Sequence, residues 1–302
     1  MYNVKLAAMF KMILAMSIFG SIGFFTVKTG VPAIELVFVR CIFATIFLSL
    51  CWLLTGHHKV EVWNKRELLV TLICGIFLVL NWVFLFKAFE QMSITISISI
   101  YHLAPIFVLI LGSLVLKERM NIMSLIAIVV CFLGSILVVG TNGYSSLTDL
   151  VNSGFIWALL AAICYAMTML LGKGINQLSA YAMTFVQTFI GIIILFPFID
   201  LSKFDNLTFF NWLFILGTGF IHTGLVYYLF FDSLRKLPTS VISALVFLDP
   251  AVAILLDIII VGFRPSLMQI IDILLIFSGM VYTLVKPKKN GKYETIEGNL
   301  NP

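Results

Sequence analysis

Ten apolar segments, each long enough to cross a bilayer as a helix, occupy nearly all of this 302-residue chain. A helix needs about 20 apolar residues to span the hydrocarbon layer. Runs of this length exclude the shorter, alternating strands of membrane barrels. The sequence therefore predicts an all-α integral membrane protein with ten transmembrane helices. The predicted spans are 6–27, 33–54, 68–86, 92–116, 122–140, 154–171, 180–199, 209–231, 238–261 and 267–285.

The composition and the charge distribution also indicate an integral membrane protein. The chain is 61% hydrophobic and 11% charged, whereas soluble domains are about half apolar and about a quarter charged. Lysine and arginine gather in alternate connections, so the positive-inside rule predicts a multi-pass protein of the cell membrane with both termini in the cytoplasm. Five cysteines without paired spacing predict no disulfide, metal site or other cofactor. No feature predicts nucleic-acid binding, and the oligomeric state is left open.

The chain is a duplication. Shifted by 145 positions, residues 81–140 align without a gap with the second half, and Pro105 falls on Pro250. Each half has five spans, an odd number, so the second copy is predicted to enter the membrane upside down. Inverted repeats recur in carriers, because two similar halves can exchange conformations around a central site. The predicted organisation is a first repeat (1–140), an outward loop (141–153), a second, inverted repeat (154–286) and a polar cytoplasmic tail (287–302).

Several short motifs follow this duplication in a fixed order. They are Phe19-Gly20, Arg40, the turn Lys117-Glu118-Arg119, Gly134, Gln187 and Asp249-Pro250. The set resembles the drug/metabolite transporter (DMT) superfamily in its ten-helix EamA-type branch. The resemblance implies a metabolite carrier, often an exporter, with a central cavity walled by all spans except the fifth and tenth. It implies no particular substrate, and Phe263 departs from the pattern where the second copy of the turn lacks its glutamate.

Two ionisable residues near the bilayer centre are the first candidates for a site. Asp249 precedes Pro250, and His102 lies three residues before Pro105. A proline can free carbonyl groups to face a cavity, or it can be a tolerated kink. Because Asp249 aligns with Ala104, helix packing alone does not demand an acid there. Ionisable groups are costly in hydrocarbon, so we expect a site between the two prolines, formed by His102 and Asp249.

Other polar residues in the spans leave alternatives open. Arg40 is either an anion anchor or the partner of an acid such as Asp257 or Asp272. His102 and His222 either titrate near neutral pH or serve as neutral, hydrogen-bonded core groups. Neutral polar and deeper aromatic residues complete the predicted cavity lining: Asn81, Gln187, Trp82, Tyr101, Tyr165, Tyr227 and Tyr228.

These features favour a secondary transporter over an enzyme. Its predicted partners are the lipid bilayer and a small-molecule substrate, an amino acid or a similar solute, which it exports by alternating access. The sequence contains no P-loop, so a proton gradient or the gradient of the cargo is the expected driving force. One alternative is an intramembrane lipid-modifying enzyme, which requires a nucleophile with a base or a metal cluster. The other alternative is a passive channel.

Overall fold

The computed structural model describes residues 2–92, 94–115 and 154–256, together with the single positions 126, 129, 258, 259 and 274. Within this part every regular element is helical, and six helices are long and apolar enough to cross a membrane. The predicted all-α membrane fold is therefore confirmed. Apart from positions 126, 129 and 274, the predicted fifth and tenth spans lie outside the described residues, as do the turn at 117–119 and the acids Asp257 and Asp272.

Four spans make up the described part of the first half. They are α1 (Tyr2–Phe19) with α2 (Ile22–Thr29), α3 (Ala33–Leu54), α4 (Lys65–Gln91), and α5 (Ile94–Tyr101) with α6 (Ala104–Val115). The turn η1 (His57–Lys59) lies between α3 and α4. The side chain of Asn64 accepts hydrogen bonds from the amides of Arg66 and Glu67, which explains why α4 begins at Lys65.

The second half repeats this plan. Its spans are α9 (Ile156–Gly174), α10 (Ala180–Leu195) with η3 (Phe196–Phe198), α11 (Phe209–Gly219) joined through the π-helical η5 (Phe220–Leu225) to α12 (Val226–Leu234), and α13 (Thr239–Leu245) with α14 (Leu248–Leu256). The turn η4 (Leu201–Phe204) precedes α11. A shift of 145 residues carries α3 onto α10 and η3, and α4 onto the span from α11 to α12. The duplication predicted from sequence is visible in these bounds.

The two halves are inverted relative to one another. Helices α4 and α9 run antiparallel, because Asn81 donates to the carbonyl of Ala161 while, nearer the start of α4, Glu67 accepts from the amide of Asn176. Within the first half the chain reverses at each short connection, so the first span and α4 point the same way. The first span of the second half, α9, therefore points opposite to its counterpart, which is the arrangement of an inverted repeat.

Equivalent residues of the two halves meet at the centre. Trp82 and Tyr227 are 145 positions apart and share a hydrogen bond of 2.6 Å. His102 and Phe247 have the same spacing, and their ring centroids are 5.6 Å apart. A two-fold rotation places the midpoint of two equivalent points on its axis. The pseudo-two-fold axis relating the repeats therefore passes between these two pairs.

Each half also ties the end of its third span to the start of its second. The amide of Ala33 donates to Oε1 of Glu90 over 2.7 Å. At the equivalent positions, Nη1 of Arg235 donates to the carbonyl of Leu178 over 2.5 Å. Equivalent hydrogen bonds thus connect these spans in both repeats. The charged side chain is the carboxylate of Glu90 in the first repeat and the guanidinium of Arg235 in the second.

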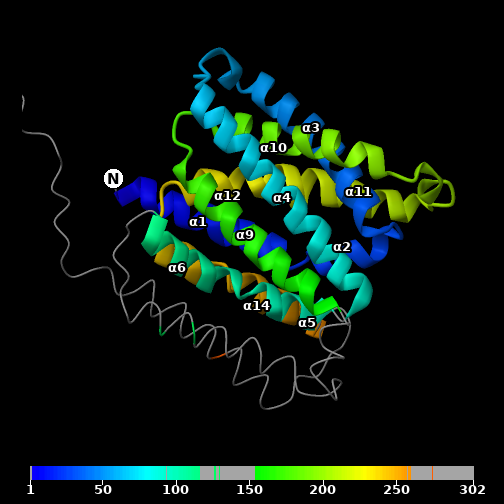
Figure 1. The fold of residues 1–302 in the computed structure, drawn as a ribbon. Coiled ribbons are helices and arrows are strands. Elements are labelled where there is room, and N and C mark those ends of the chain that lie inside the picture. Colours follow the sequence, from blue (N-terminus) through cyan, green and yellow to red (C-terminus); the bar gives the residue numbers. More distant parts are fainter. Residues whose placement is uncertain are drawn as a thin grey trace, which may run out of the picture.

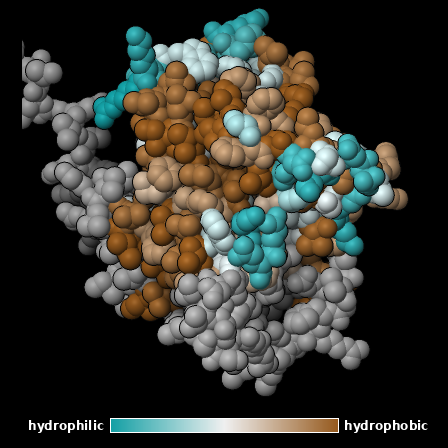
Figure 2. Space-filling model, turned by 45° about the vertical axis from the view of Figure 1, so that its right-hand side comes forward, coloured by the Kyte–Doolittle hydropathy of each residue, from teal (hydrophilic) through white to brown (hydrophobic). Residues whose placement is uncertain are grey.

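The helices form one bundle with an apolar exterior. Figure 1 shows α3 and α10 on one side of the bundle and α5, α6 and α14 on the other, with α1, α4, α9 and α12 between them. Exposed apolar side chains include Phe10, Leu54 and Phe189. Figure 2 shows a broad apolar area bordered by polar groups, as expected where lipid surrounds a bundle between two aqueous layers.

Candidate functional site

Four of the eight described spans are interrupted partway along their length. The first span breaks at Gly20 and Ser21, the fourth between α5 and α6, the eighth at η5, and the ninth between α13 and α14. Interrupted backbone is tolerated inside a membrane only where protein or a water-filled cavity receives its polar groups. In transporters, discontinuous helices of this kind form the binding site near the bilayer midplane.

The local sequence explains these breaks. Pro105 and Pro250 lie in the first turns of α6 and α14, where a missing amide donor costs nothing and the fixed φ favours a new helix. At Gly20 the reason is close packing, since a Cβ there would lie 2.7 Å from the carbonyl oxygen of Asp249. The interruption η5 is a π-helical segment, a feature that occurs frequently at functional sites.

A group of buried polar and aromatic side chains, the central cluster, lies among these spans. Nε1 of Trp82 donates to the hydroxyl of Tyr227 over 2.6 Å. Nδ2 of Asn81 lies 2.8 Å from the carbonyl of Ala161 and 3.3 Å from the hydroxyl of Tyr101. The ring of Tyr101 stacks on Tyr165 with centroids 5.1 Å apart. The members of the central cluster are Arg40, Asn81, Trp82, Tyr101, Tyr165, Tyr227 and Asp249.

Asp249 and His102 both carry an unsatisfied atom. Oδ1 of Asp249 is buried without a hydrogen-bond partner, and the carboxyl group interacts electrostatically with Tyr227. Nδ1 of His102 lies 2.6 Å from the carbonyl of Ile98, while its Nε2 is buried and unpartnered. The structure therefore does not join His102 and Asp249 by a hydrogen bond. It places Asp249 in the central cluster and His102 against Phe247.

His222 joins two of the interrupted spans. Its Nε2 lies 2.8 Å from Oγ of Ser21, and its Nδ1 lies 3.2 Å from the carbonyl of Gly217. The Ser21 hydroxyl also lies 2.8 Å from the carbonyl of Ile18. Carbonyl groups only accept, and a hydroxyl has one proton. All three bonds therefore form together only when His222 is an imidazolium. A neutral ring loses one of the three. With the proton on Nδ1 it accepts from Ser21, which then releases Ile18, and with the proton on Nε2 it loses the bond to Gly217.

Two of the predicted lining residues lie away from the central cluster. Gln187 on α10 donates to Sγ of Cys74 over 3.1 Å, and its Oε1 is buried without a partner. Tyr228 stacks on Tyr181, with centroids 4.2 Å apart. Tyr228 and Tyr181 line a cavity of about 420 Å³ at the end of the bundle. Neither Gln187, which lies beside Cys74, nor Tyr228, which lines this cavity, therefore belongs to the central cluster.

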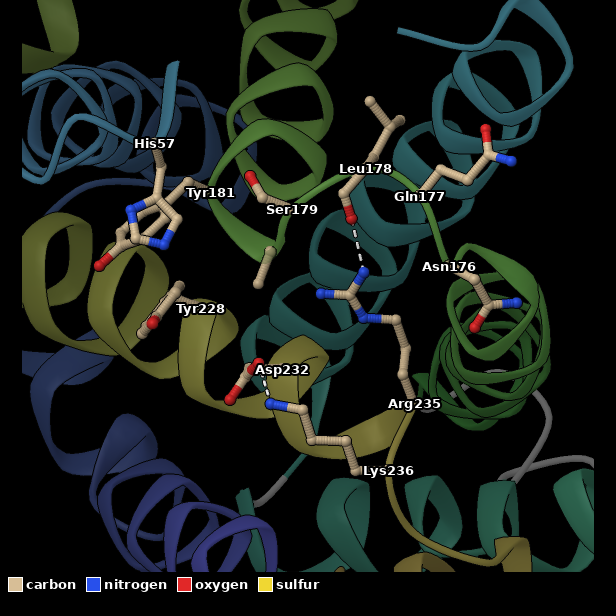
Figure 3. A pocket seen from close by; sticks show the side chains of 11 residues that line it. His57, Asn176, Gln177, Leu178, Ser179, Tyr181, Tyr228, Asp232, Arg235 and Lys236 are labelled. Atoms are coloured by element: carbon tan, nitrogen blue, oxygen red, sulfur yellow. Dashed lines mark hydrogen bonds and ion pairs between the residues drawn. The ribbon is translucent and has the colours of Figure 1, made fainter. Parts of the chain in front are cut away.

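The cavity beside Tyr228 is walled by paired charges. Figure 3 shows Arg235 reaching the carbonyl of Leu178, and Lys236 reaching Asp232. Asp232 also binds Lys11 of α1 over 2.6 Å, which links the two repeats. Burial lowers the pKa of the Arg235 guanidinium, while the nearby carboxylate of Asp232 acts in the opposite direction. The charged groups of this wall are therefore already satisfied within the protein.

Three contributors to the central site were not predicted. Thr223 accepts a hydrogen bond of 2.7 Å from Nε of Arg40, Phe86 lies against the same guanidinium, and Ser21 binds His222. A hydroxyl or phenyl group in a hydrophobic span is typical of ordinary helix packing, so the sequence alone does not single these residues out. The position of Tyr227 did carry a signal, because it is the repeat equivalent of Trp82.

Comparisons with known proteins agree with this architecture. The sequence profile of the EamA-like transporter family matches residues 6–140 and 152–285. Buried polar groups at interrupted spans of a duplicated membrane bundle, together with this match, define a multi-pass membrane transporter. The chain belongs to the EamA-like transporter family of the DMT superfamily.

Similar proteins carry the same broad description. The uncharacterised transporter YxxF of Bacillus subtilis (strain 168) is 57% identical over 295 residues, covering 97% of this chain and 94% of that protein. An uncharacterised transporter of Archaeoglobus fulgidus is 22% identical over 271 residues, covering 89% and 93%. A crystal structure with 16% identity has a TM-score of 0.78 and covers 92% of this chain and 98% of its own, which shows a shared fold.

Proposed function

We propose that the protein is a secondary carrier that exports a small metabolite, an amino acid or a similar solute, by alternating access. The observation that carries this proposal is the meeting of interrupted spans from both inverted halves at one buried polar cluster. A site between two inverted halves can open to either side when the halves exchange conformations. The relatives named as transporters support transport, and the solute and its direction are our inference.

We also propose that both termini face the cytoplasm. The ion pairs of Lys11 and Lys236 with Asp232 lie at one end of the bundle. At the other end, Nδ2 of Asn211 donates to the carbonyl of Lys28, and the acidic side chains of Glu35 and Asp200 also lie there. The excess of basic residues at the first end supports its placement in the cytoplasm. The remaining domain limits, including the loop 141–153 and the tail 287–302, stay predictions.

Counterflow in proteoliposomes tests the carrier proposal. Vesicles containing the purified protein are loaded with one unlabelled amino acid at a time and diluted into the same labelled amino acid. We expect saturable, transient accumulation of label for at least one amino acid, because a carrier exchanges bound solute across the membrane. Flux that rises linearly with concentration would instead indicate a channel. Absence of flux for all twenty amino acids would contradict the proposed cargo.

Coupling to protons is the driving force that we propose, with His222 as the proton-binding group. Protonation allows both ring nitrogens to donate while Ser21 still donates to Ile18, at the point where the first span breaks, whereas the neutral ring loses one of these bonds. The charged group facing this histidine is Arg40 on α3, with which it interacts electrostatically. A proton on His222 therefore adds a second positive charge beside Arg40, a state that the carboxylate of a bound amino acid would stabilise.

The variant His222→Gln is expected to lose solute accumulation driven by an imposed pH gradient, by about tenfold, while keeping counterflow without a gradient. Glutamine retains hydrogen bonding but does not titrate. Uptake is measured in the same vesicles with and without the gradient. His58→Gln, on the connection between α3 and α4, is the matched control and should behave as wild type. Equal gradient-driven accumulation by the two variants would exclude His222 as the coupling residue.

A further inference from the structure

Arg40 is a buried cation with an unsatisfied donor. Its side chain on α3 is among the largest that are fully buried, and the residue is 1% exposed. Nε donates to Oγ1 of Thr223 over 2.7 Å, while Nη1 is buried without a hydrogen-bond partner. An arginine is always protonated in proteins, so the charge cannot be removed by titration. The guanidinium needs an acceptor that the described protein does not supply at Nη1.

The surroundings of Arg40 hold it in place without neutralising it. The guanidinium carbon lies 4.5 Å from the ring centroid of Trp82 and 5.2 Å from that of Phe86. Such cation–π contacts attract the charge to the ring face, but they accept no N–H bond. Within residues 2–92, 94–115 and 154–256, no carboxylate forms an ion pair with Arg40. The guanidinium is therefore fixed in position while Nη1 has no hydrogen-bond partner.

A second unsatisfied group, the carboxyl group of Asp249, lies in the same cluster. Oδ1 of Asp249 is buried without a hydrogen-bond partner. Contacts connect Asp249 to Arg40: the Arg40 guanidinium lies over Trp82, and Trp82 donates to Tyr227. The Tyr227 ring lies 5.0 Å from that of Phe19, and the next residue, Gly20, packs against the carbonyl of Asp249. A buried charge without a partner is strongly destabilising, so a guanidinium and a carboxyl group that both lack partners are complementary to a ligand that carries a carboxylate and an ammonium group.

We propose that Arg40 binds the carboxylate of the transported solute through Nη1, and that Asp249 binds its ammonium group. The inference rests on the proposed carrier function and specifies what the carrier recognises. The solute is an α-amino acid type zwitterion, for which the carboxylate is obligatory. Trp82, Phe86 and Thr223 are positioning residues that orient the guanidinium. A planar fork suits a carboxylate better than an ammonium does.

Competition in the counterflow assay tests this proposal. The probes are each transported amino acid, its decarboxylated amine and its methyl ester, added outside vesicles that contain wild type, Arg40→Gln or Arg40→Lys. We expect the amine and ester to compete with wild type at least about tenfold less well than the amino acid, the size of a lost charged hydrogen bond. In Arg40→Gln the three probes should become equal competitors. Arg40→Lys should recover part of the preference.

Asp249→Asn is the companion variant. In vesicles with this variant, the amino acid should compete less well than it does in vesicles with wild type. N-acetylated amino acids, which lack the ammonium group, should compete to the same extent in both kinds of vesicle. Tighter competition by the N-acetylated compound than by the free amino acid in wild type would overturn the role of Asp249.

A structural role of Arg40 gives a different result. If Arg40 only stabilises the bundle, Arg40→Gln lowers transport of every probe but leaves the ratio of amino acid to amine unchanged, and the proposal fails. The same conclusion follows if Asp257→Asn or Asp272→Asn reproduces Arg40→Gln, because Arg40 would then be the partner of an acid.

Thermal unfolding without solute identifies variants that do not fold. If Arg40→Gln is one of them, it is replaced by Thr223→Val, which loosens the guanidinium. Saturable counterflow of wild type without any preference for the carboxylate would overturn this proposal and leave the carrier function standing.

Discussion

Replacing Gly20 by alanine is expected to reduce the initial rate of counterflow by at least about tenfold. The added Cβ would lie 2.7 Å from the carbonyl oxygen of Asp249 and 2.7 Å from Cβ of Val252. Overpacking a close contact costs about 1–3 kcal/mol, and here one of the atoms is a backbone oxygen that cannot rotate away. The substitution therefore pushes the first span from α14 at the level of the central cluster.

The control for Gly20→Ala is Gly174→Ala. Gly174 is the last residue of α9, and a Cβ there would meet nothing within 4 Å. Both variants are measured by counterflow and by thermal unfolding in the same detergent. We expect the control to match wild type in both. Unchanged transport by Gly20→Ala would show that the contact between the first span and α14 opens freely during the cycle.

The variant Trp82→Ala is expected to cause the largest loss of stability among the central residues. Trp82 is 3% exposed, donates to Tyr227 and supports the guanidinium of Arg40. Truncating a buried aromatic side chain costs about 3–5 kcal/mol. The surface variant Trp63→Ala is the control, since this side chain is 52% exposed and should cost little. The midpoint of thermal unfolding gives the order of the two effects.

A double-mutant cycle separates the hydrogen bond from the packing. Trp82→Phe and Tyr227→Phe each remove the bond of 2.6 Å and retain an aromatic ring. If the bond is the main coupling, the double variant should cost less than the two single variants together, because the second change has no bond left to break. Strictly additive costs would mean that ring packing alone joins the two repeats at this point.

Much of the fold follows from the sequence for physical reasons. Long apolar runs fix the spans, and the 145-residue duplication with an odd number of spans fixes their inversion. The alternating segment 94–101 is helical, as α5 shows, although its pattern is that of a strand. This segment lies in the predicted span 92–116, and the prediction of a helix is correct there because an isolated strand cannot satisfy its backbone in lipid.

The interruptions were harder to predict. The breaks in the fourth and ninth spans have prolines beside them, whereas the π-helical η5 has no such marker. The first span breaks at Gly20, but α9 runs on through Tyr165, which occupies the equivalent position. The first repeat thus has Gly20 at this position, where it packs closely against α14, and the second repeat has Tyr165, whose ring stacks on Tyr101. Such a difference depends on what each span contacts, which the linear pattern does not contain.

The candidate site was predicted in part. Arg40, Asn81, Trp82, Tyr101, Tyr165 and Asp249 lie in the central cluster. Gln187 and Tyr228 lie elsewhere, because a deep position along a helix does not say which face turns inward. The proposed roles of all these residues await the experiments above.

The position of the pseudo-two-fold axis bears on the direction of transport. The axis passes between Trp82 and Tyr227, at the central cluster. A solute bound on such an axis faces the same length of protein toward each side of the membrane, so geometry alone gives neither side an advantage. The net direction of the proposed transport therefore comes from the gradients across the bilayer, while the interruptions found in only one repeat can change only the rates of the individual steps. A chain of this design works as readily in reverse when those gradients are reversed.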